Sequence, residues 1–226
     1  MILGIDSSAI TAGCALCEGG KIIAEEFLNT KHTHSQTLLP MVESMLKEAG
    51  VTLADVERIA VTAGPGSFTG LRIGIAAVKG MGMGAGKPCV PVSTLLAIAH
   101  NFAGFDCTVC ACMDARCNQV YNALFRVENG KVTRLCDDRA IRIEQLSEEL
   151  PKLCGRVILA GDGAELVDNL TDHKFELAPP LLRYQRGSGV CFSAAEAESV
   201  EAAALMPSYL RLPQAERERL AKEQQT

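Results

Sequence analysis

The chain opens with short runs of apolar and β-branched residues, and it then changes to the three-to-four-residue apolar spacing of a helix. This spacing predicts a helix over 33–49, with Leu38, Val42 and Met45 on its apolar face and Gly50 after its end. The runs before it predict strands at 2–6, 12–18 and 21–28, the last two joined as a hairpin.

The same change from strand to helix occurs in the next stretch. The run 57–63 predicts a strand that stops at the turn Gly64-Pro65-Gly66, and the residues after it predict a helix over 69–85. A strand at 89–92 and a helix that begins at the cap Ser93 and ends near 101 follow.

The second half of the chain repeats the order of the first. The strand predicted at 107–113 runs into Asp114 as the first strand ends at Asp6, and residues 123–132 echo 15–22. Two copies of one strand-and-helix unit predict a duplicated α/β fold with mixed sheets. A helix over 144–153 and a strand at 157–160 close the second copy, and a helix over 194–205 follows.

The duplication divides the chain into two subdomains and a tail. The expected ranges are 1–103 for the first subdomain, 104–211 for the second and 212–226 for a charged tail. The segment near 194–211 could pack back on the first subdomain. The tail has few apolar residues, so we expect no core there.

The charge balance limits the function. The formal net charge is −5, and affinity for nucleic acid depends on Lys and Arg, so we expect tRNA or other nucleic acid to be contacted only through partners. The apolar window 71–92 contains Arg72, Lys79 and Lys87, which argues against a membrane span. The start of the chain leads directly into a strand pattern, so a cytoplasmic protein is expected.

The ten cysteines are expected to be reduced core thiols. Cys110 and Cys112 have strand spacing, although a zinc cluster within 107–117 is the alternative. No His-x-x-x-His pair occurs in the chain, so neither a metal nor an intrinsic cofactor is expected.

Hydroxyl and carboxyl groups gather where anions commonly bind. Asp6, followed by Ser7 and Ser8, could face a phosphate or its Mg²⁺, or could cap its own turn. The helix start near Ser67 and Thr69 offers free N–H groups. In the second half, Asp114 and Arg116 hold the matching positions, but their turn has no glycine, which argues against a phosphate hairpin.

The helix over 69–85 is rich in glycine. Gly70 and Gly74 lie on one face, and each glycine costs about 1 kcal/mol of helix stability relative to alanine. Close packing on the parent sheet explains such a face, and so does a helix–helix contact with a partner.

Several segments together resemble the TsaB (YeaZ) family, the relative of the catalytic TsaD family in bacterial threonylcarbamoyladenosine (t6A) synthesis. They are Ile5-Asp6-Ser7-Ser8, the stretch from Gly64 to Gly74, Met113-Asp114-Ala115-Arg116, Gly161-Asp162-Gly163 and Tyr209-Leu210-Arg211. In the catalytic relative, a helix carries two metal-binding histidines four residues apart. Thr94 and Ile98 stand at those positions here.

The resemblance implies an ASKHA (actin/Hsp70-like) fold with two RNase H-like subdomains. It implies a non-catalytic scaffold that binds the catalytic subunit TsaD, the ATPase TsaE and a second copy of itself, in a complex that transfers threonylcarbamoyl to N6 of adenosine 37 of tRNA. ATP or ADP with Mg²⁺ is possible at a complex interface. The implied interface lies on the first two helices: His34, Leu38, Met41, Val42, Met45, Gly70, Leu71, Gly74, Ile75 and Val78.

Two other classes of protein remain alternatives. An ATP-dependent enzyme such as a small-molecule kinase requires two glycine-bearing phosphate hairpins and a catalytic carboxylate, for which only Asp6 is well suited. A metallohydrolase requires the missing histidine pair.

Overall fold

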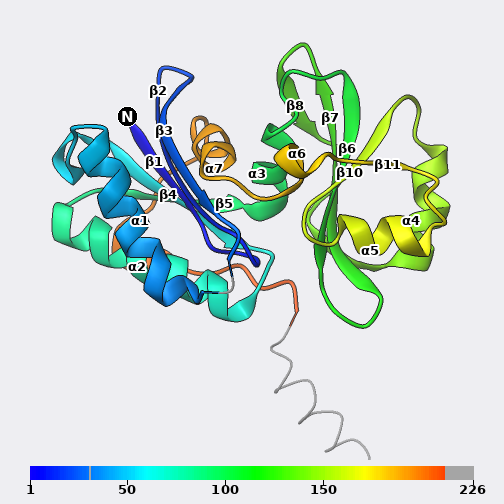
Figure 1. The fold of residues 1–226 in the computed structure, drawn as a ribbon, viewed down its shortest axis with the longest axis horizontal. Helices are drawn as coiled ribbons and strands as arrows, with labels where there is room; N and C mark the ends of the chain where they lie inside the picture. Colours follow the sequence, from blue (N-terminus) through cyan, green and yellow to red (C-terminus); the bar gives the residue numbers. More distant parts are fainter. Residues whose placement is uncertain (31, 212–226) are drawn as a thin grey trace, which may run out of the picture.

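The computed structural model describes residues 1–30 and 32–211, which form two sheets of the same topology (Figure 1). The first has the strand order β3-β2-β1-β4-β5, and the second has β8-β7-β6-β10-β11 with β9 paired to β7. In both, three antiparallel strands are followed by two parallel ones. The predicted duplication and mixed sheets are confirmed.

The first half of the chain follows the sequence prediction closely. The first three strands have the predicted ends, and Ser93 caps the helix after the fifth strand by accepting from the Leu96 N–H. The elements are β1 Ile2–Asp6, β2 Ala12–Glu18, β3 Lys21–Leu28, α1 His34–Glu48, β4 Arg58–Gly64, α2 Phe68–Ala85, β5 Cys89–Ser93 and α3 Thr94–His100, with a 3-10 turn at Leu53–Asp55.

The second half is more irregular. The helix predicted over 144–153 ends at Glu149 and continues as the 3-10 turn Leu150–Lys152, with Pro151 inside it. The elements are β6 Cys107–Asp114, β7 Gln119–Glu128, β8 Lys131–Arg134, β9 Arg139–Arg142, α4 Ile143–Glu149, β10 Val157–Ala160, α5 Ala164–Leu170, β11 Glu176–Leu177, α6 Pro180–Arg183, α7 Gly187–Ala194 and a 3-10 turn at Ala202–Ala204.

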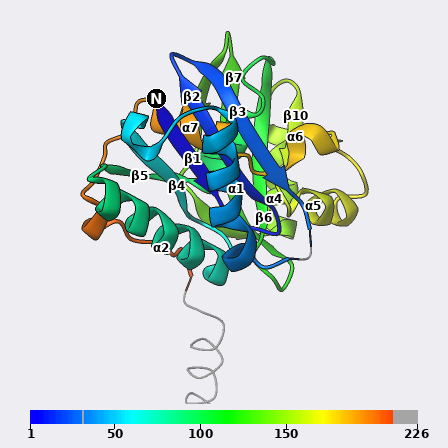
Figure 2. The same cartoon turned by 60° about the vertical axis from the view of Figure 1, so that its left-hand side comes forward.

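Helices cover both faces of the first sheet (Figure 2). α1 and α2 pack on one face, where Leu38, Met45 and Ile75 join Leu3 and Ile59 in one hydrophobic cluster. α7 packs on the other face against β1 and β2. The first sheet is therefore a buried layer between two layers of helix.

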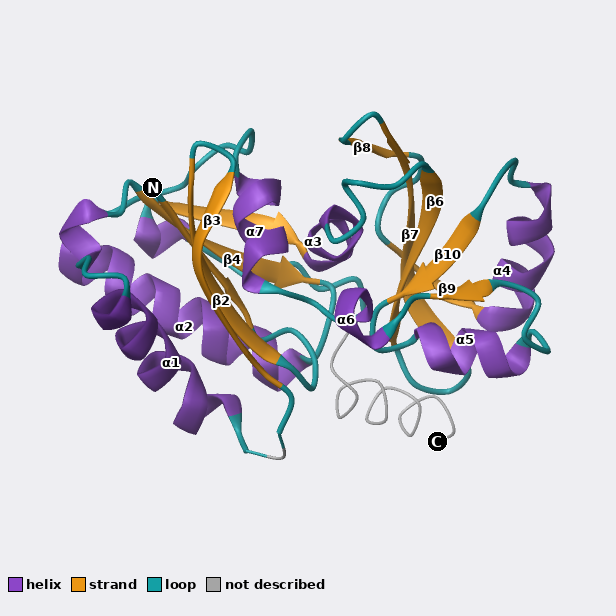
Figure 3. Ribbon diagram, turned by 45° about the horizontal axis from the view of Figure 1, so that its top comes forward, coloured by secondary structure: helices purple, strands orange, loops and turns teal. Residues whose placement is uncertain are grey.

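The two halves exchange a helix. α3 belongs to the first half by sequence, yet Leu95, Ile98 and Phe102 pack with Val109 and Phe125 of the second sheet. α7 belongs to the second half and covers the first sheet. Figure 3 shows both helices between the sheets.

The prediction of a helix over 194–205 is wrong. The helix in this region is α7, which ends at Ala194, and only the 3-10 turn Ala202–Ala204 follows it in the described chain. α7 is buried on nearly every side, so its sequence has no polar face to reveal its period. The tail predicted at 212–226 lies outside the described residues.

Candidate functional site

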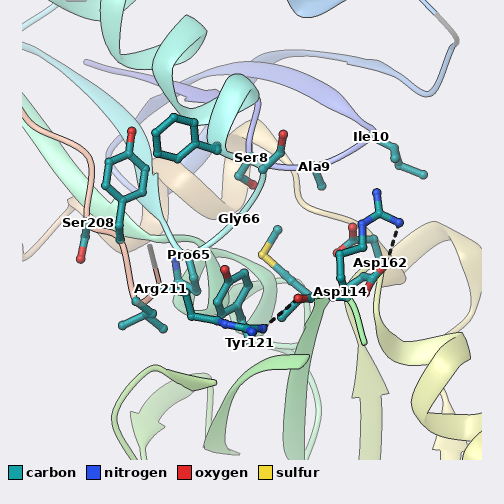
Figure 4. Close-up of a pocket in the computed structure, with 17 residues that line it drawn as sticks. Ser8, Ala9, Ile10, Pro65, Gly66, Asp114, Tyr121, Asp162, Ser208 and Arg211 are labelled. Carbon is teal, nitrogen blue, oxygen red and sulfur yellow. Dashed lines mark hydrogen bonds and ion pairs between the residues drawn. The ribbon is translucent and has the colours of Figure 1, made fainter. Parts of the chain in front are cut away.

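A cleft of about 450 Å³ lies between the two halves of the molecule (Figure 4). Its walls come from turns that follow β1, β4 and β6, and from the chain after the last 3-10 turn. We call it the interdomain cleft and define it by residues 8–10, 65–68, 113–116 and 208–211 with Tyr121 and Asp162.

Asp6 lies beneath this cleft and is fully buried. Its Oδ2 accepts a hydrogen bond of 2.8 Å from the Ser8 hydroxyl, and its Oδ1 accepts from the Ser8 N–H at 3.3 Å. Burial raises the pKa of the Asp6 carboxyl, and the hydrogen bonds from Ser8 oppose the rise. Asp6 therefore caps its own turn, as one of the two interpretations from sequence stated.

Two further carboxyl groups line the cleft. Asp114 ends β6, and Asp162 follows the parallel strand β10, so both lie at the same edge of the second sheet. Burial raises the pKa of Asp162 to about 6, and the negative charge of Asp114 adds to the rise. Asp114 accepts a 2.7 Å hydrogen bond from the Arg116 N–H and pairs with its guanidinium at 3.3 Å.

Two of the N–H donors at the start of α2 are engaged within the protein. The Ser67 N–H donates to the Ser8 carbonyl at 2.7 Å, and the Ser67 hydroxyl oxygen accepts from the Gly70 N–H. Gly66 packs so closely that a Cβ there would lie 2.4 Å from the Ser8 carbonyl oxygen. The Gly-Pro-Gly turn thus packs on the first hairpin turn and caps a helix.

Some of the residues predicted to contact an anion line the interdomain cleft, and others lie outside its lining. Ser8, Ser67, Asp114 and Arg116 line the cleft. Asp6 lies below it, and the other two are outside its lining: Ser7 is buried under α2 and Thr69 is exposed on that helix.

Asp162, Tyr209 and Arg211 line the cleft but were not chosen as site residues. Asp162 could have been found from its position just after β10, because β10 is parallel to β6, the strand that ends at Asp114. Tyr209 and Arg211 follow a long irregular stretch, which gave no indication of where they would lie.

The two turns that face the cleft differ from glycine-lined phosphate turns in their local structure. The Ser67 N–H is already bonded, and the second turn places Arg116, Cys117 and Asn118 at positive φ with side chains where glycine would leave room.

The predicted interface residues lie on the faces of α1 and α2 that pack inside the chain. The apolar side chains chosen, among them Leu38, Met45, Leu71 and Val78, are at most 5% exposed because they form the core over the first sheet. The two glycines, Gly70 and Gly74, are also buried. The others of this set, Met41, Val42 and Ile75, are buried in the same core, and half-buried His34 bonds the Ala9 carbonyl through Nε2 at 2.7 Å.

The opposite face of the same helices carries a shallow groove. Its floor consists of small residues of α2, and its walls carry Leu39, which is 51% exposed, Leu53 and Met81. Apart from the neighbouring backbone of α2 itself, no atom lies within 4 Å of a Cβ built on Gly80 or Gly84, so these glycines lie on an open surface. We define the helix groove by Leu39, Leu53, Ala76, Ala77, Gly80, Met81, Gly84 and Ala85.

The structure also shows where the cysteines of 107–117 and the residues Thr94 and Ile98 lie. Cys110 and Cys112 are buried in β6, as their strand spacing predicted, with their sulfurs 3.5 Å apart. Over residues 1–30 and 32–211, no group of three or more His, Cys, Asp or Glu side chains is arranged to hold a metal ion. Thr94 and Ile98 are fully buried. No helix in the described chain is long and apolar enough to cross a membrane.

Two RNase H-like sheets around a central cleft define an ASKHA-type protein. A family model described as tRNA N6-adenosine threonylcarbamoyltransferase (TsaD) matches residues 21–218. The Bacillus subtilis protein TsaB, named for tRNA threonylcarbamoyladenosine biosynthesis, is 32% identical over 95% of this chain and 96% of its own. The chain belongs to the TsaB (YeaZ) family, which is related to TsaD.

Two further matches agree. The Escherichia coli TsaB is 35% identical over 72% of this chain and 71% of its own. The structure of YeaZ from Pseudomonas aeruginosa superimposes with a TM-score of 0.80 at 30% identity, covering 92% of this chain and 99% of the other. The fold is therefore shared along nearly the whole described chain.

Proposed function

We propose that this chain is a non-catalytic subunit in t6A synthesis, which binds the catalytic TsaD-type subunit through the helix groove and supports its activity. The carrying observation is the groove itself, where Leu39 and Met81 flank the open glycines Gly80 and Gly84. Small residues let a partner helix approach closely, and exposed apolar side chains gain free energy when covered.

The absence of catalysis is supported by the buried positions. Thr94 and Ile98, which stand where the resemblance places metal-binding histidines, are packed in the core and carry no imidazole. In this proposal tRNA contact belongs mainly to the partner, and TsaE joins the complex as the ATPase. No observation favours the kinase or the metallohydrolase alternative.

The groove is tested with two charged variants, Ala76→Glu and Gly80→Glu. Both positions are exposed on α2, and glutamate is a good helix former, so the fold should persist. We expect each variant to weaken binding of the purified catalytic subunit at least about tenfold in calorimetry, because a carboxylate is desolvated at the interface. Unchanged affinity would remove the groove from the proposal.

The matched control is Asn169→Glu, which adds the same charge on an exposed position of α5 in the other half. It should bind like the wild type. We also propose that the helix groove binds a second copy of the chain. Light scattering of the same panel tests this self-association, and Ala76→Glu should lower the dimer fraction.

A second assay distinguishes a scaffold role of this chain from a catalytic role. Purified chain with tRNA and threonylcarbamoyl adenylate should form no t6A, and addition of the catalytic subunit should restore formation. Steady product formation by the chain alone would overturn the non-catalytic role.

A further inference from the structure

The chain after the last 3-10 turn crosses from the first half of the molecule to the second. We call residues 205–211 the strap. It begins at Leu205, which is fully buried in the first core, and the Ser208 N–H then donates to the Ala63 carbonyl at 2.7 Å. A Cβ on Gly64 would lie 2.2 Å from the Ser208 carbonyl oxygen, so glycine at the end of β4 is needed for this approach.

The strap is latched on the first turn of α2. The ring of Tyr209 stacks on Phe68 with 4.6 Å between centroids and 27° between planes. The Arg72 guanidinium carbon lies 3.9 Å from the Phe68 ring centroid, and its Nε donates to the Tyr209 hydroxyl at 3.1 Å. Three side chains from two segments thus form one layered cluster.

Two residues later the strap reaches the other half. Nη1 of Arg211 donates to the Ala115 carbonyl at 3.0 Å. Ala115 belongs to the turn that carries Asp114 and Arg116, and Figure 4 shows this turn opposite Ser8 across the cleft.

We propose that the strap is a clamp that fixes the turn 114–119 relative to the start of α2 and thereby sets the opening of the interdomain cleft. Its two anchors, Tyr209 on α2 and Arg211 on Ala115, are separated by one residue, which leaves little slack. Because α2 also forms the helix groove, the clamp joins the groove helix to the cleft. The inference does not depend on which partner binds the groove.

The test is hydrogen exchange of the full chain with Tyr209→Ala, Arg211→Gln and both together. We expect the Ser208 amide to exchange at least about tenfold faster in Tyr209→Ala, since an aromatic pair and a hydrogen bond are lost. The amides of 115–119 should exchange faster in Arg211→Gln and fastest in the double variant. Amides of β1 and β6 should keep wild-type protection in all three.

Two further variants make the result specific. Met206→Ala removes a 66% exposed side chain from the same strap and should leave all these rates unchanged. Tyr209→Phe keeps the stack but loses the hydrogen bond from Arg72, so the Ser208 amide should have an intermediate rate. Wild-type exchange at 115–119 in the double variant would overturn the clamp, as would a uniform increase over both sheets, which is global destabilisation.

Discussion

The carbonyl oxygen of Ser7 would lie 2.1 Å from a Cβ atom placed on Gly70. The Ser7 hydroxyl also donates to the Gly70 carbonyl at 2.9 Å, and a Cβ on Gly74 would lie 2.3 Å from the same hydroxyl oxygen. The glycine face of α2 therefore lets the helix lie directly on the first hairpin turn. Close packing within the chain explains Gly70 and Gly74, whereas Gly80 and Gly84 face open space.

Gly70→Ala should destabilise the protein, whereas Gly80→Ala should not. The first places a methyl group against a backbone oxygen that cannot turn away, and such overpacking costs about 1–3 kcal/mol of unfolding free energy. The second meets no atom and gains up to about 1 kcal/mol of helix propensity. Urea unfolding measures both, and equal midpoints for the two variants would contradict this account of the helix.

Glu25→Gln should loosen α7 from the first sheet. Glu25 on β3 accepts hydrogen bonds from Arg186, with Nη2 at 2.7 Å, and from the Ser188 hydroxyl at 2.6 Å, at the start of α7. Burial raises the pKa of Glu25, but these bonds outweigh it and hold the net pKa below its ordinary value. We expect a loss of about 2–4 kcal/mol at pH 7.

The contribution of Glu25 to stability should depend on pH in a defined direction. A depressed carboxyl pKa means that its stabilisation is present above the unfolded value, 4.5, and is lost as pH falls below it. The wild type should therefore lose stability on acidification below about pH 4.5 more steeply than Glu25→Gln. Glu48→Gln, an exposed position on α1, is the control and should leave the profile unchanged.

Asp162→Asn should stabilise the protein at neutral pH. The folded pKa is about 6 and the unfolded value is 3.8, so the folded state binds more protons between these values. Stability then falls as pH rises from about 4 to 6, by up to about 3 kcal/mol. Asparagine removes this term, so the thermal midpoint of the variant should exceed that of the wild type at pH 7 and approach it near pH 4.

His100→Gln should change the same pH range in the opposite direction. Burial lowers the pKa of His100 to about 4 from 6.5, so the unfolded state takes up the proton first as pH falls. This histidine therefore removes stability below about pH 6.5, and the glutamine variant should show a flatter acid limb in thermal melts. An unchanged acid limb would mean that His100 is solvated and titrates normally.

The sequence was most informative where local pattern and packing agree. Strands such as Ile2–Asp6 and Ala12–Glu18 are short, mainly apolar runs bounded by turn residues, so their ends were predicted correctly. The repeated order of elements also predicted the duplicated fold, since it depends on order alone.

The sequence led to a different expectation where an apolar helix face could be covered by either of two partners. Amphipathic spacing indicates that Leu38 and Ile75 are buried, but it does not indicate whether a sheet of the same chain or another protein covers them. The apolar faces of α1 and α2 pack on the first sheet of the same chain. The helix groove contains short side chains such as Ala76 and Gly80, which contribute little to a periodic pattern. α7 was missed because Gly187 and Gly189, which indicate a turn, allow close contact with Cys14 and Ala97.

The exchange of α3 and α7 has a consequence for synthesis on the ribosome. The first sheet is complete once β5 has emerged, but the helix that covers its inner face, Gly187–Ala194, is translated much later. At about 5–20 residues per second, that face stays open for several seconds. The first half of the molecule can therefore complete its packing only after Gly187–Ala194 has been synthesised.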